Sequence, residues 1–342
     1  MNRRLALLIL APLLALLAAC GTTPPAAVPG AGFATALARA APFAVGVYGI
    51  ARNPAPTVAA NAPADSERGE TVLPYARIGA GFFIDNQGFV VTAAHVVADC
   101  DEVIVKLADQ RVIPATLVGL DADTDVAVLR IASPGPVAPP LGRSTALRPG
   151  HWVLSVGEPY GLNGSVAAGI VGGTDRHFSD DPELLFLQSD LALNPGNSGG
   201  PLLDTAGDIV GMNMRTVVSA YGTPGVSLSI PIEIVLGVVA ELRSGGRIVR
   251  PRLGAEFDDL SAHLALARGR TTTQGALITI VRRGSLAERL GLKVDDIVVS
   301  MNDRPVARSA DLARSLLGWR QTRGTRVVVL RGDEVVSLTL ND

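Results

Sequence analysis

NPGNSGGPL, residues Asn194–Leu202, sets one serine, Ser198, among glycines directly before an apolar run. Peptide-bond hydrolysis builds negative charge on the former carbonyl oxygen, and backbone N–H groups must converge on that oxygen without side chains blocking the substrate. The N–H groups of Gly196, Asn197 and Ser198 are therefore the candidate oxyanion donors. Glycine-rich turns also occur without any chemical role, so the motif needs a base and a carboxylate elsewhere in the chain.

The base is expected from TAAHVV, residues Thr92–Val97, which places His95 directly after the apolar run Phe89–Val91. A serine hydroxyl is a poor nucleophile until a base removes its proton. The other histidines have no comparable setting and are interpreted as surface or linker residues. His95 is therefore the predicted base.

A carboxylate must hold the histidine in the right tautomer, and the stretch DADTD offers three aspartates. The last of them, Asp125, stands directly before an alternating apolar strand pattern and is the predicted orienting carboxylate. Asp121 and Asp123 are expected to be solvated turn residues.

The composition favours a β-rich protein of more than one domain. The chain has 342 residues, of which 48% are hydrophobic and 18% charged, with 37 glycines and 23 prolines. That length exceeds the usual single domain, and so many turn residues imply short elements. The formal net charge of -2 leaves no basic surplus for phosphate groups, so nucleic acid is not expected as a partner.

Short β-branched runs separated by turn residues predict barrel strands. These are Gly81–Ile84, Phe89–Val91, Val103–Leu107, Val126–Ile131 and Trp152–Val156. Helical spacing first appears at Ile232–Leu242. Beyond it the pattern predicts a compact α+β module with strands at Ala276–Val281 and Asp296–Met301, a helix capped by Ser285 and closed by Gly291, a helix capped by Ser309, and a hairpin turning at Gly332.

The amino terminus is typical of a lipoprotein export signal. Its apolar run, Leu5–Ala19, follows two arginines and is shorter than the roughly 20 residues needed to span a bilayer. The run ends in LAAC and resembles a bacterial lipobox, in which Cys20 is acylated and becomes the first mature residue. An ordinary cleaved secretory signal is the alternative. By the same resemblance, Gly21 in place of Asp implies the outer membrane.

These patterns divide the chain. Residues 1–19 are the predicted signal peptide, and residues 20–32, rich in Pro, Ala, Gly and Thr, a disordered tether. A folded domain is expected at 33–243, a Gly- and Arg-rich linker at 244–251, and a second domain at 252–342.

Cys100 is the other cysteine, so with Cys20 acylated no intramolecular disulfide can form. Nothing around Cys100 is typical of an activated thiol, and we interpret it as structural. The sequence predicts no metal site and no cofactor.

In their order along the chain, these motifs resemble the HtrA (Deg) family of envelope serine proteases. The matching phrases are Gly81–Val97, Thr124–Leu129, Gly157–Leu162, Gly169–Val171, Leu187–Asp190 and Asn194–Leu202. The resemblance implies a mostly β fold, in which a trypsin-like protease domain of two six-stranded barrels precedes a smaller α+β PDZ domain. It makes His95 the base, Asp125 its orienter and Ser198 the nucleophile, in the His, Asp, Ser order of trypsin-fold proteases.

The resemblance also implies two binding regions. Leu253, Gly254 and Ala255 match the PDZ loop that receives a peptide's terminal carboxylate, and the peptide is expected to add as a strand. The substrate pocket is expected at Ala192, Ser227, Leu228 and Ser229, where the sequence SLS departs from the family's usual Gly-Phe-Ala. An uncharged Ala192 argues against Lys or Arg at the cleaved residue and suits small aliphatic side chains.

The remaining expectations concern regulation and setting. Arg176 matches a sensor-loop arginine that responds to PDZ occupancy, although an ordinary solvated loop would look the same. The resemblance implies trimers, built through Phe33–Tyr48, that act on unfolded proteins at the periplasmic face of the outer membrane. The alternative function is an inert, membrane-anchored PDZ scaffold or a holdase chaperone, against which an intact triad argues.

Overall fold

The computed structural model describes residues 32–51, 75–137, 139–157, 164–178, 181–218, 224–320 and 322–341. The predicted signal peptide, Cys20 and nearly all of the predicted tether lie outside these ranges, so their interpretation stays a prediction. Among the described residues, no helix is long and apolar enough to cross a membrane.

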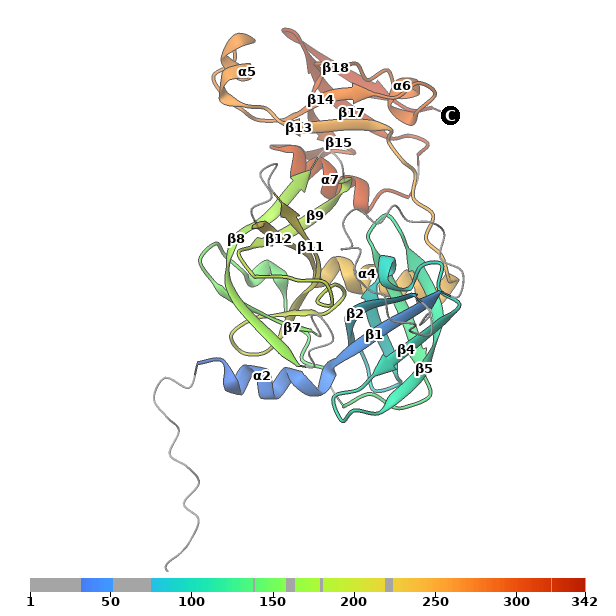
Figure 1. The fold of residues 1–342 in the computed structure, drawn as a ribbon. Helices are drawn as coiled ribbons and strands as arrows, with labels where there is room; N and C mark the ends of the chain where they lie inside the picture. Colours follow the sequence, from blue (N-terminus) through green and yellow to red (C-terminus); the bar gives the residue numbers. More distant parts are fainter. Residues whose placement is uncertain are drawn as a thin grey trace, which may run out of the picture. The chain divides into compact units, whose positions relative to one another are not determined.

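Six strands close the first barrel in the order β1-β2-β3-β6-β5-β4 (Figure 1). Helix α2 (Ala34–Ala40) and a 3₁₀ turn, η1 (Ala41–Phe43), precede β1 (Ala44–Ala51), β2 (Tyr75–Phe83), β3 (Phe89–Ala93), β4 (Glu102–Lys106), β5 (Val112–Asp121) and β6 (Val126–Ile131). Apolar side chains fill the interior, with Val47, Val105 and Leu129 fully buried. Closure pairs each strand on both sides and leaves the barrel no open edge.

Six further strands close the second barrel in the order β10-β11-β12-β9-β8-β7. They are β7 (Trp152–Gly157), β8 (Ser165–Phe178), β9 (Asp181–Ser189), β10 (Pro201–Leu203), β11 (Ile209–Val218) and β12 (Pro224–Pro231), preceded by the 3₁₀ turn η2 (Ser144–Ala146). Leu154, Phe186 and Ile230 are fully buried in it. Strands β8 and β9 pair beyond the barrel as far as Phe178 and Asp181, so they project as a long hairpin.

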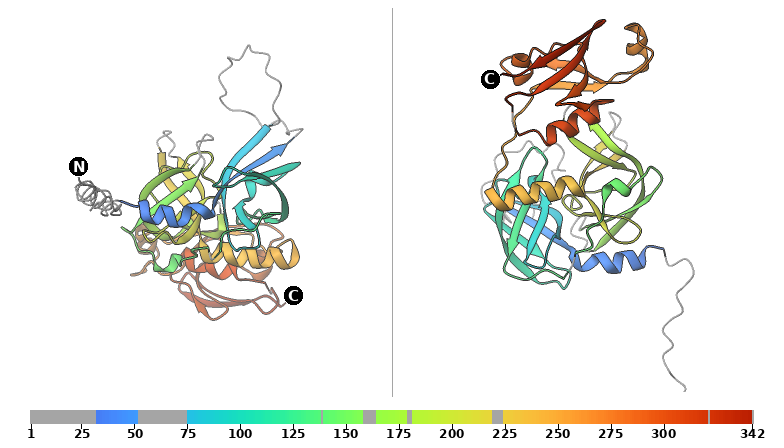
Figure 2. Two further views of the ribbon diagram at one scale, coloured as in Figure 1. Left: turned by 90° about the horizontal axis from the view of Figure 1, so that it is seen from below. Right: turned by 180° about the vertical axis from the view of Figure 1, so that it is seen from behind.

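Helix α4 (Ile232–Gly245) follows β12 and packs against β5, β6 and β11, so it contacts both barrels (Figure 2). It ends at Gly246, which has a left-handed φ of 71° and donates its N–H to Leu242. A Cβ on Gly119 of β5 would lie 2.3 Å from the Gly246 carbonyl oxygen, so this close approach requires glycine.

The C-terminal module is a six-stranded sheet with three helices. Its elements are β13 (Ala255–Asp259), α5 (Ala262–Ala267), β14 (Ala276–Val281), α6 (Leu286–Leu290), β15 (Ile297–Met301), β16 (Arg304–Pro305), α7 (Ser309–Leu317), β17 (Arg326–Arg331) and β18 (Glu334–Thr339). Phe257, Ile278 and Val298 are fully buried in its core. The expected fold class, two six-stranded barrels followed by an α+β module, is confirmed.

The helix caps of the module differ in detail from the sequence patterns. Ser285 caps α6 by accepting the Glu288 N–H, as expected, and Gly291 ends the helix with φ of 87°. Ser309, however, does not cap α7: its N–H and hydroxyl both donate to Asp259 at 2.8 and 2.7 Å, and Arg308 occupies the cap position. Asp259 on β13 accepts both of these hydrogen bonds, so the Ser309 hydroxyl is not available to cap the helix.

Asp121 and Asp123, expected to be solvated, are instead ion-paired to Arg250 of the predicted linker and to Arg252 directly after it. Asp121 is buried and accepts hydrogen bonds at 2.5 Å from both the Thr124 hydroxyl and the Arg250 guanidinium. Arg252 pairs with Asp123. The partners are 129 residues apart, so local turn chemistry could not reveal them. The predicted linker is therefore pinned to the first barrel by charge.

The buried pair gives a stability prediction. The Arg250 and Asp121 side chains are 3% and 4% exposed, so Arg250→Met would leave an uncompensated buried carboxylate. We expect a loss of about 3 to 5 kcal/mol in the free energy of unfolding, measured by urea denaturation of the whole protein. Arg320→Met, which removes a half-exposed pair with Glu241, is the matched control and should cost less than about 1 kcal/mol. Equal losses in the two variants would contradict the assignment.

Candidate active site

His95 and Asp125 are brought together by two neighbouring strands. His95 lies on the short helix α3 (Ala94–Val97) directly after β3, and Asp125 lies directly before β6. Because Ala93 of β3 pairs with Val126 of β6, the barrel register itself sets the two residues side by side. The placement of His95 beside Asp125 therefore does not depend on the conformation of a long loop.

Both carboxylate oxygens of Asp125 are used on His95. Oδ2 lies 2.7 Å from the ring Nδ1, and Oδ1 accepts the His95 backbone N–H at 2.8 Å. The Asp125 carbonyl also accepts the N–H of Ala94 at 2.9 Å. Asp125 reaches this position with φ of 53°, in the left-handed region that non-glycine residues rarely adopt. The Asp125 side chain is 12% exposed and that of His95 53%, so the carboxylate is shielded while the ring remains accessible.

A positive charge fixes the other side of α3. The Arg77 guanidinium donates to the carbonyls of His95 and Ala98 at 3.0 and 2.6 Å. These are C-terminal carbonyls of a helix of one turn, where a cation is favourable. Arg77 thus holds the backbone that carries the base.

Ser198 lies in a loop clamped between the two barrels. Its carbonyl accepts the Ala80 N–H of β2 at 2.8 Å, and the next residue, Gly199, donates to Asn213 of β11 at 2.8 Å. Gly199 has φ of 85°, and a Cβ there would lie 2.4 Å from the Ala80 carbonyl oxygen. The glycine after the serine is therefore a steric requirement of the barrel contact.

The Ser198 hydroxyl donates to the Met214 carbonyl at 3.0 Å. Within the described residues, no hydrogen bond joins this hydroxyl to His95. A change of the serine χ1 rotamer would redirect the proton toward the imidazole, and such bonds commonly tighten only when substrate binds.

The three predicted oxyanion donors differ in their backbone hydrogen bonds. The Asn197 N–H donates to the Asn194 carbonyl at 3.0 Å, so this amide is already engaged, which argues against it as an oxyanion donor. Tight turn geometry at Asn194–Asn197 is the reason. Gly196 is buried with φ of 103°, and in the described part of the chain neither its N–H nor that of Ser198 donates to a backbone carbonyl. Both remain candidate donors.

A cavity of about 370 Å³ opens beside the candidate nucleophile. It is lined by Ile78, His95, Leu193, Asn194, Pro195, Gly196, Ser198, Met214, Arg215 and Thr216. Leu193, Met214, Arg215 and Thr216 were not predicted from the sequence. The last three lie on β11, where an irregular register between Asn213 and Arg215 leaves Met214 without a partner on β12 and has no sequence signature.

The four residues predicted to form the substrate pocket do not line this cavity, and their role stays a prediction. Ala192 is exposed and is not part of the cavity lining. Ser227 donates to the Leu191 carbonyl at 2.6 Å, Ser229 donates to the Asn213 side chain at 3.1 Å, and Leu228 is fully buried. Ser227 and Ser229 share one face of β12 and Leu228 lies on the other, and the two hydroxyls satisfy neighbouring polar groups.

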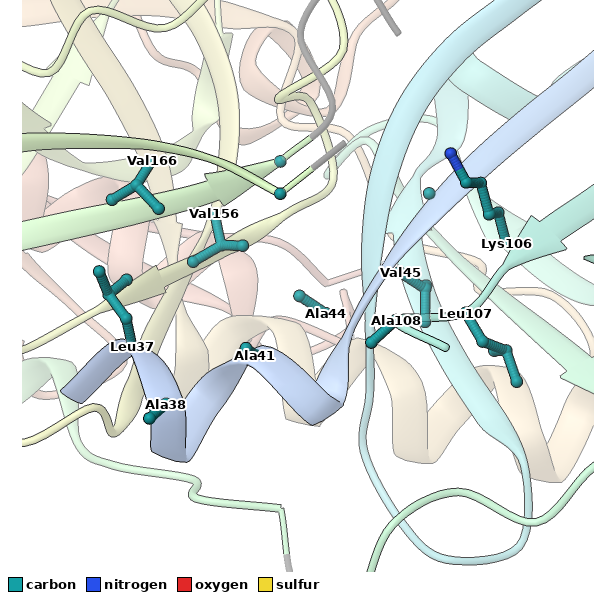
Figure 3. A pocket seen from close by; sticks show the side chains of 13 residues that line it. Leu37, Ala38, Ala41, Ala44, Val45, Lys106, Leu107, Ala108, Val156 and Val166 are labelled. Atoms are coloured by element: carbon teal, nitrogen blue, oxygen red, sulfur yellow. The ribbon is translucent and has the colours of Figure 1, made fainter. Parts of the chain in front are cut away.

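A second, apolar pocket of about 330 Å³ lies between α2 and the two barrels (Figure 3). Leu37, Val45, Val156 and Val166 point into it, with Lys106 at one side (Figure 3). It contains none of the candidate catalytic residues. Among the residues that the structure describes, no group of three or more His, Cys, Asp or Glu side chains could hold a metal ion.

Cys100 is half-buried, and its Sγ lies 3.6 Å from the carbonyl oxygens of Val96 and Ala98. Burial raises the pKa of the thiol, and the opposing effect of Arg77 is smaller. A thiol with a raised pKa is a poor nucleophile. This agrees with the structural interpretation of Cys100.

Arg176 lies on strand β8 rather than in a loop, so the expected sensor loop is a hairpin here. Its Nε donates to the Gln188 side chain on β9 at 2.6 Å. The preceding residue, Asp175, pairs with Arg308 and Arg314 of the C-terminal module at 3.2 and 2.8 Å. The ion pairs with the C-terminal module are therefore made by Asp175, and not by Arg176, for which the contact was predicted.

The same hairpin packs into the core of the module. The His177 ring stacks on buried Phe257 of β13, with centroids 4.6 Å apart. Leu185 of β9 is buried among the side chains of that core, and β9 lies against α7 (Figure 1). Sequence patterns gave no sign of this packing, because the region of Arg176 was expected to be a loop.

The predicted carboxylate loop is held by the rest of the module. Gly254 has φ of 71°, and a Cβ there would lie 2.4 Å from the Ser285 Cβ. The carbonyls of Leu253 and Gly254 accept N–H groups from Ala287 and Arg282 at 2.8 and 2.9 Å. The loop therefore has a fixed conformation that requires glycine at its centre.

Comparison with known proteins finds two domain families in the chain. A trypsin-like peptidase domain matches residues 79–212, and a PDZ domain matches residues 251–341. A protein of Ectopseudomonas mendocina described as "Probable periplasmic serine endoprotease DegP-like" is 39% identical over 74% of this chain and 54% of its own length. A protein of Pseudomonas putida (strain F1) with the same description is 37% identical over 81% and 58%. The chain thus spans just over half the length of these curated relatives.

Solved structures match over nearly the whole chain. The structure "HtrA-type protease AlgW with tripeptide" is 30% identical, with a TM-score of 0.72, over 91% of this chain and 96% of that one. A serine endoprotease from Yersinia pestis is 26% identical, with a TM-score of 0.61, over 91% and 97%.

Proposed function

The chain belongs to the HtrA family of serine proteases, and from this premise we propose that it is an endopeptidase of the cell envelope that hydrolyses unfolded or damaged proteins. The observation that carries the proposal is the double hydrogen bond from His95 to the Asp125 carboxylate, in a cavity shared with Ser198. The curated relatives are described as periplasmic, which supports the same compartment for this chain.

The residues divide the chemistry among them. His95 accepts the Ser198 proton as the serine Oγ attacks the substrate carbonyl carbon, and Asp125 stabilises the resulting imidazolium. The N–H groups of Gly196 and Ser198 receive the negative oxygen. His95 then gives its proton to the departing amine, and water, activated by the same imidazole, releases the acyl group from Ser198.

The alternative, an inert PDZ scaffold or holdase, is less well supported. Inactive relatives of proteases are expected to lose a triad residue or to block the oxyanion loop. Here Gly196 is retained in a left-handed conformation and the His95 ring faces an open cavity. A holding role that accompanies proteolysis is compatible with the same surfaces.

We infer that the β8–β9 hairpin links the PDZ domain to catalysis. The hairpin contacts both β13 and α7, the two elements between which a PDZ ligand adds as a strand. A bound C-terminal peptide would then compete with His177 and Leu185 for the same apolar surface. The Arg176 side chain on β8 is hydrogen-bonded to the Gln188 side chain on β9. We propose that this contact transmits a displacement of the hairpin toward the second barrel.

Two further elements of the proposal concern the setting. Acylation of Cys20 would anchor the protein to the outer membrane with the catalytic domain in the periplasm. Segment Phe33–Tyr48 is proposed as the contact surface of a homotrimer.

The triad prediction uses single variants. Ser198→Ala, His95→Ala and Asp125→Asn should each reduce kcat for casein cleavage about a thousandfold or more, and the double variants should be no worse, because the residues act as one unit. Labelling by a fluorophosphonate probe, followed by peptide mapping, checks that Ser198 is the reacting residue. Wild-type turnover in purified Ser198→Ala would refute the assignment.

The regulatory prediction separates the two neighbouring residues. Asp175→Asn should raise PDZ affinity for a C-terminal peptide two- to fivefold, since exposed ion pairs contribute about 0.2 to 1 kcal/mol each. Arg176→Ala should keep peptide affinity but lose most of the peptide-stimulated kcat. Fluorescence anisotropy measures the first and casein cleavage the second. Arg326→Met, which breaks a pair inside the module, is the control. Equal stimulation of Arg176→Ala and wild type would make Arg176 an ordinary strand residue.

The anchor prediction concerns Cys20. Labelled fatty acid should enter the wild-type protein, and Cys20→Ser should lose both the label and membrane association, while casein cleavage by the folded domains persists. A soluble, unlabelled wild-type protein would instead indicate an ordinary secretory signal.

A further inference from the structure

The helix that carries the candidate base is too short to hold itself in place. Helix α3 has four residues, Ala94–Val97, and its single turn is closed by the Ala98 N–H, which donates to the Ala94 carbonyl at 2.8 Å. Such a turn fixes several backbone angles for one hydrogen bond, which is unfavourable without outside support. Asp125 supports the N-terminal end by accepting the N–H groups of Ala94 and His95. The position of the His95 ring therefore also depends on what holds the other end.

Arg77 of β2 holds the C-terminal end of α3. A single nitrogen, Nη1, donates to the carbonyls of His95 and Ala98 at 3.0 and 2.6 Å, across 18 and 21 residues of sequence. The last carbonyls of a helix have no partner within it, and a cation is favourable there. Arg77 is half-buried, and partial exclusion of water strengthens such a charge-assisted hydrogen bond. Arg77 is not part of the lining of the cavity beside Ser198, so its contact is with the base and not with that cavity.

The same strand also holds the loop of the nucleophile. Three residues after Arg77, the Ala80 N–H donates to the Ser198 carbonyl at 2.8 Å. Between them, a Cβ on Gly79 would lie 2.6 Å from Cγ2 of Val96 on α3 and 3.0 Å from the Ser198 carbonyl oxygen. Helix α3 and the Ser198 loop are therefore both packed against this one stretch of β2. The strand is the common support that sets the distance between base and nucleophile.

We propose that Arg77 is a positioning residue for catalysis: its hold on α3 fixes the His95 ring relative to the Ser198 hydroxyl and thereby sets kcat. The inference rests on the proposed endopeptidase function and deepens it. In the structure the hydroxyl donates to the Met214 carbonyl, so proton transfer requires the serine side chain to rotate while the ring stays in place. A ring held only from the Asp125 side would pivot about that contact, and a misplacement of about 1 Å can cost about a hundredfold in rate.

The test compares two substitutions that keep the unbranched stem of the Arg77 side chain. Arg77→Met removes the charge and both hydrogen bonds, whereas Arg77→Lys retains a cationic nitrogen that can donate to both carbonyls. kcat and KM are measured with a quenched fluorescent peptide built on one mapped cleavage site. Arg77→Met should lower kcat about ten- to hundredfold and leave KM within about twofold of wild type, because the substrate contacts are unchanged. Arg77→Lys should recover most of the lost kcat, since both bonds come from one nitrogen.

Arg148 offers the matched control. Its guanidinium also donates to two carbonyls beside a single helical turn, those of Thr145 and Leu147 at 2.8 and 2.7 Å. That turn, η2, carries none of the candidate catalytic residues, so Arg148→Met should leave kcat and KM unchanged.

Amide hydrogen exchange measures the hold on α3 without any chemistry. The peptide that contains α3 should exchange faster in Arg77→Met than in wild type and slow down again in Arg77→Lys, while exchange of the barrel strands stays the same in all three proteins. Unchanged strand exchange also shows that a lower kcat does not come from loss of the fold.

The outcomes are distinct. Wild-type kcat in Arg77→Met, a rise in KM at constant kcat, or a loss that Arg77→Lys does not lessen would overturn the inference and leave the protease assignment intact. An equal loss in Arg148→Met, or faster exchange throughout the barrel in Arg77→Met, would do the same. Fluorophosphonate labelling of wild-type Ser198 tests the function itself. If labelling and cleavage are both absent, the proposed function falls, and the exchange series still decides whether Arg77 holds α3.

Discussion

The carboxylate of Asp125 is the constraint on which the candidate site depends. One oxygen holds the His95 ring and the other holds its backbone N–H, so position and tautomer of the base are set together. This arrangement holds the backbone of Asp125 in the left-handed region. A non-glycine residue keeps such a conformation only where its surroundings enforce it. Strand pairing between β3 and β6 supplies that enforcement.

The nucleophile depends on the contact between the barrels. Ser198 is hydrogen-bonded through its carbonyl to Ala80 of the first barrel, while Gly199 is bonded to Asn213 of the second. Only a residue without a side chain fits at position 199. The glycine that follows the serine in the motif therefore lets the two barrels approach each other.

The C-terminal module is joined to the protease domain in two ways of different strength. The buried pair between Arg250 and Asp121 pins the connecting segment. The β8–β9 hairpin contributes an apolar contact at Leu185 and half-exposed ion pairs at Asp175. A bound peptide could displace the weaker hairpin contact while the buried ion pair keeps the C-terminal module attached to the protease domain. This combination suits a protease that responds to peptide binding.

Local sequence patterns were sufficient to predict the fold class and to nominate His95, Asp125 and Ser198 as the candidate triad, because strand periodicity and glycine-rich turns act through neighbouring residues. Tertiary structure alone decided which groups surround them. It placed Arg215 and Thr216 in the lining of the cavity beside Ser198, paired Asp121 with a residue 129 positions away, and gave the ion pairs with the C-terminal module to Asp175, the neighbour of Arg176. Each of these depends on strand register and on long-range charge pairing, where a slip of one residue reverses the face of every side chain.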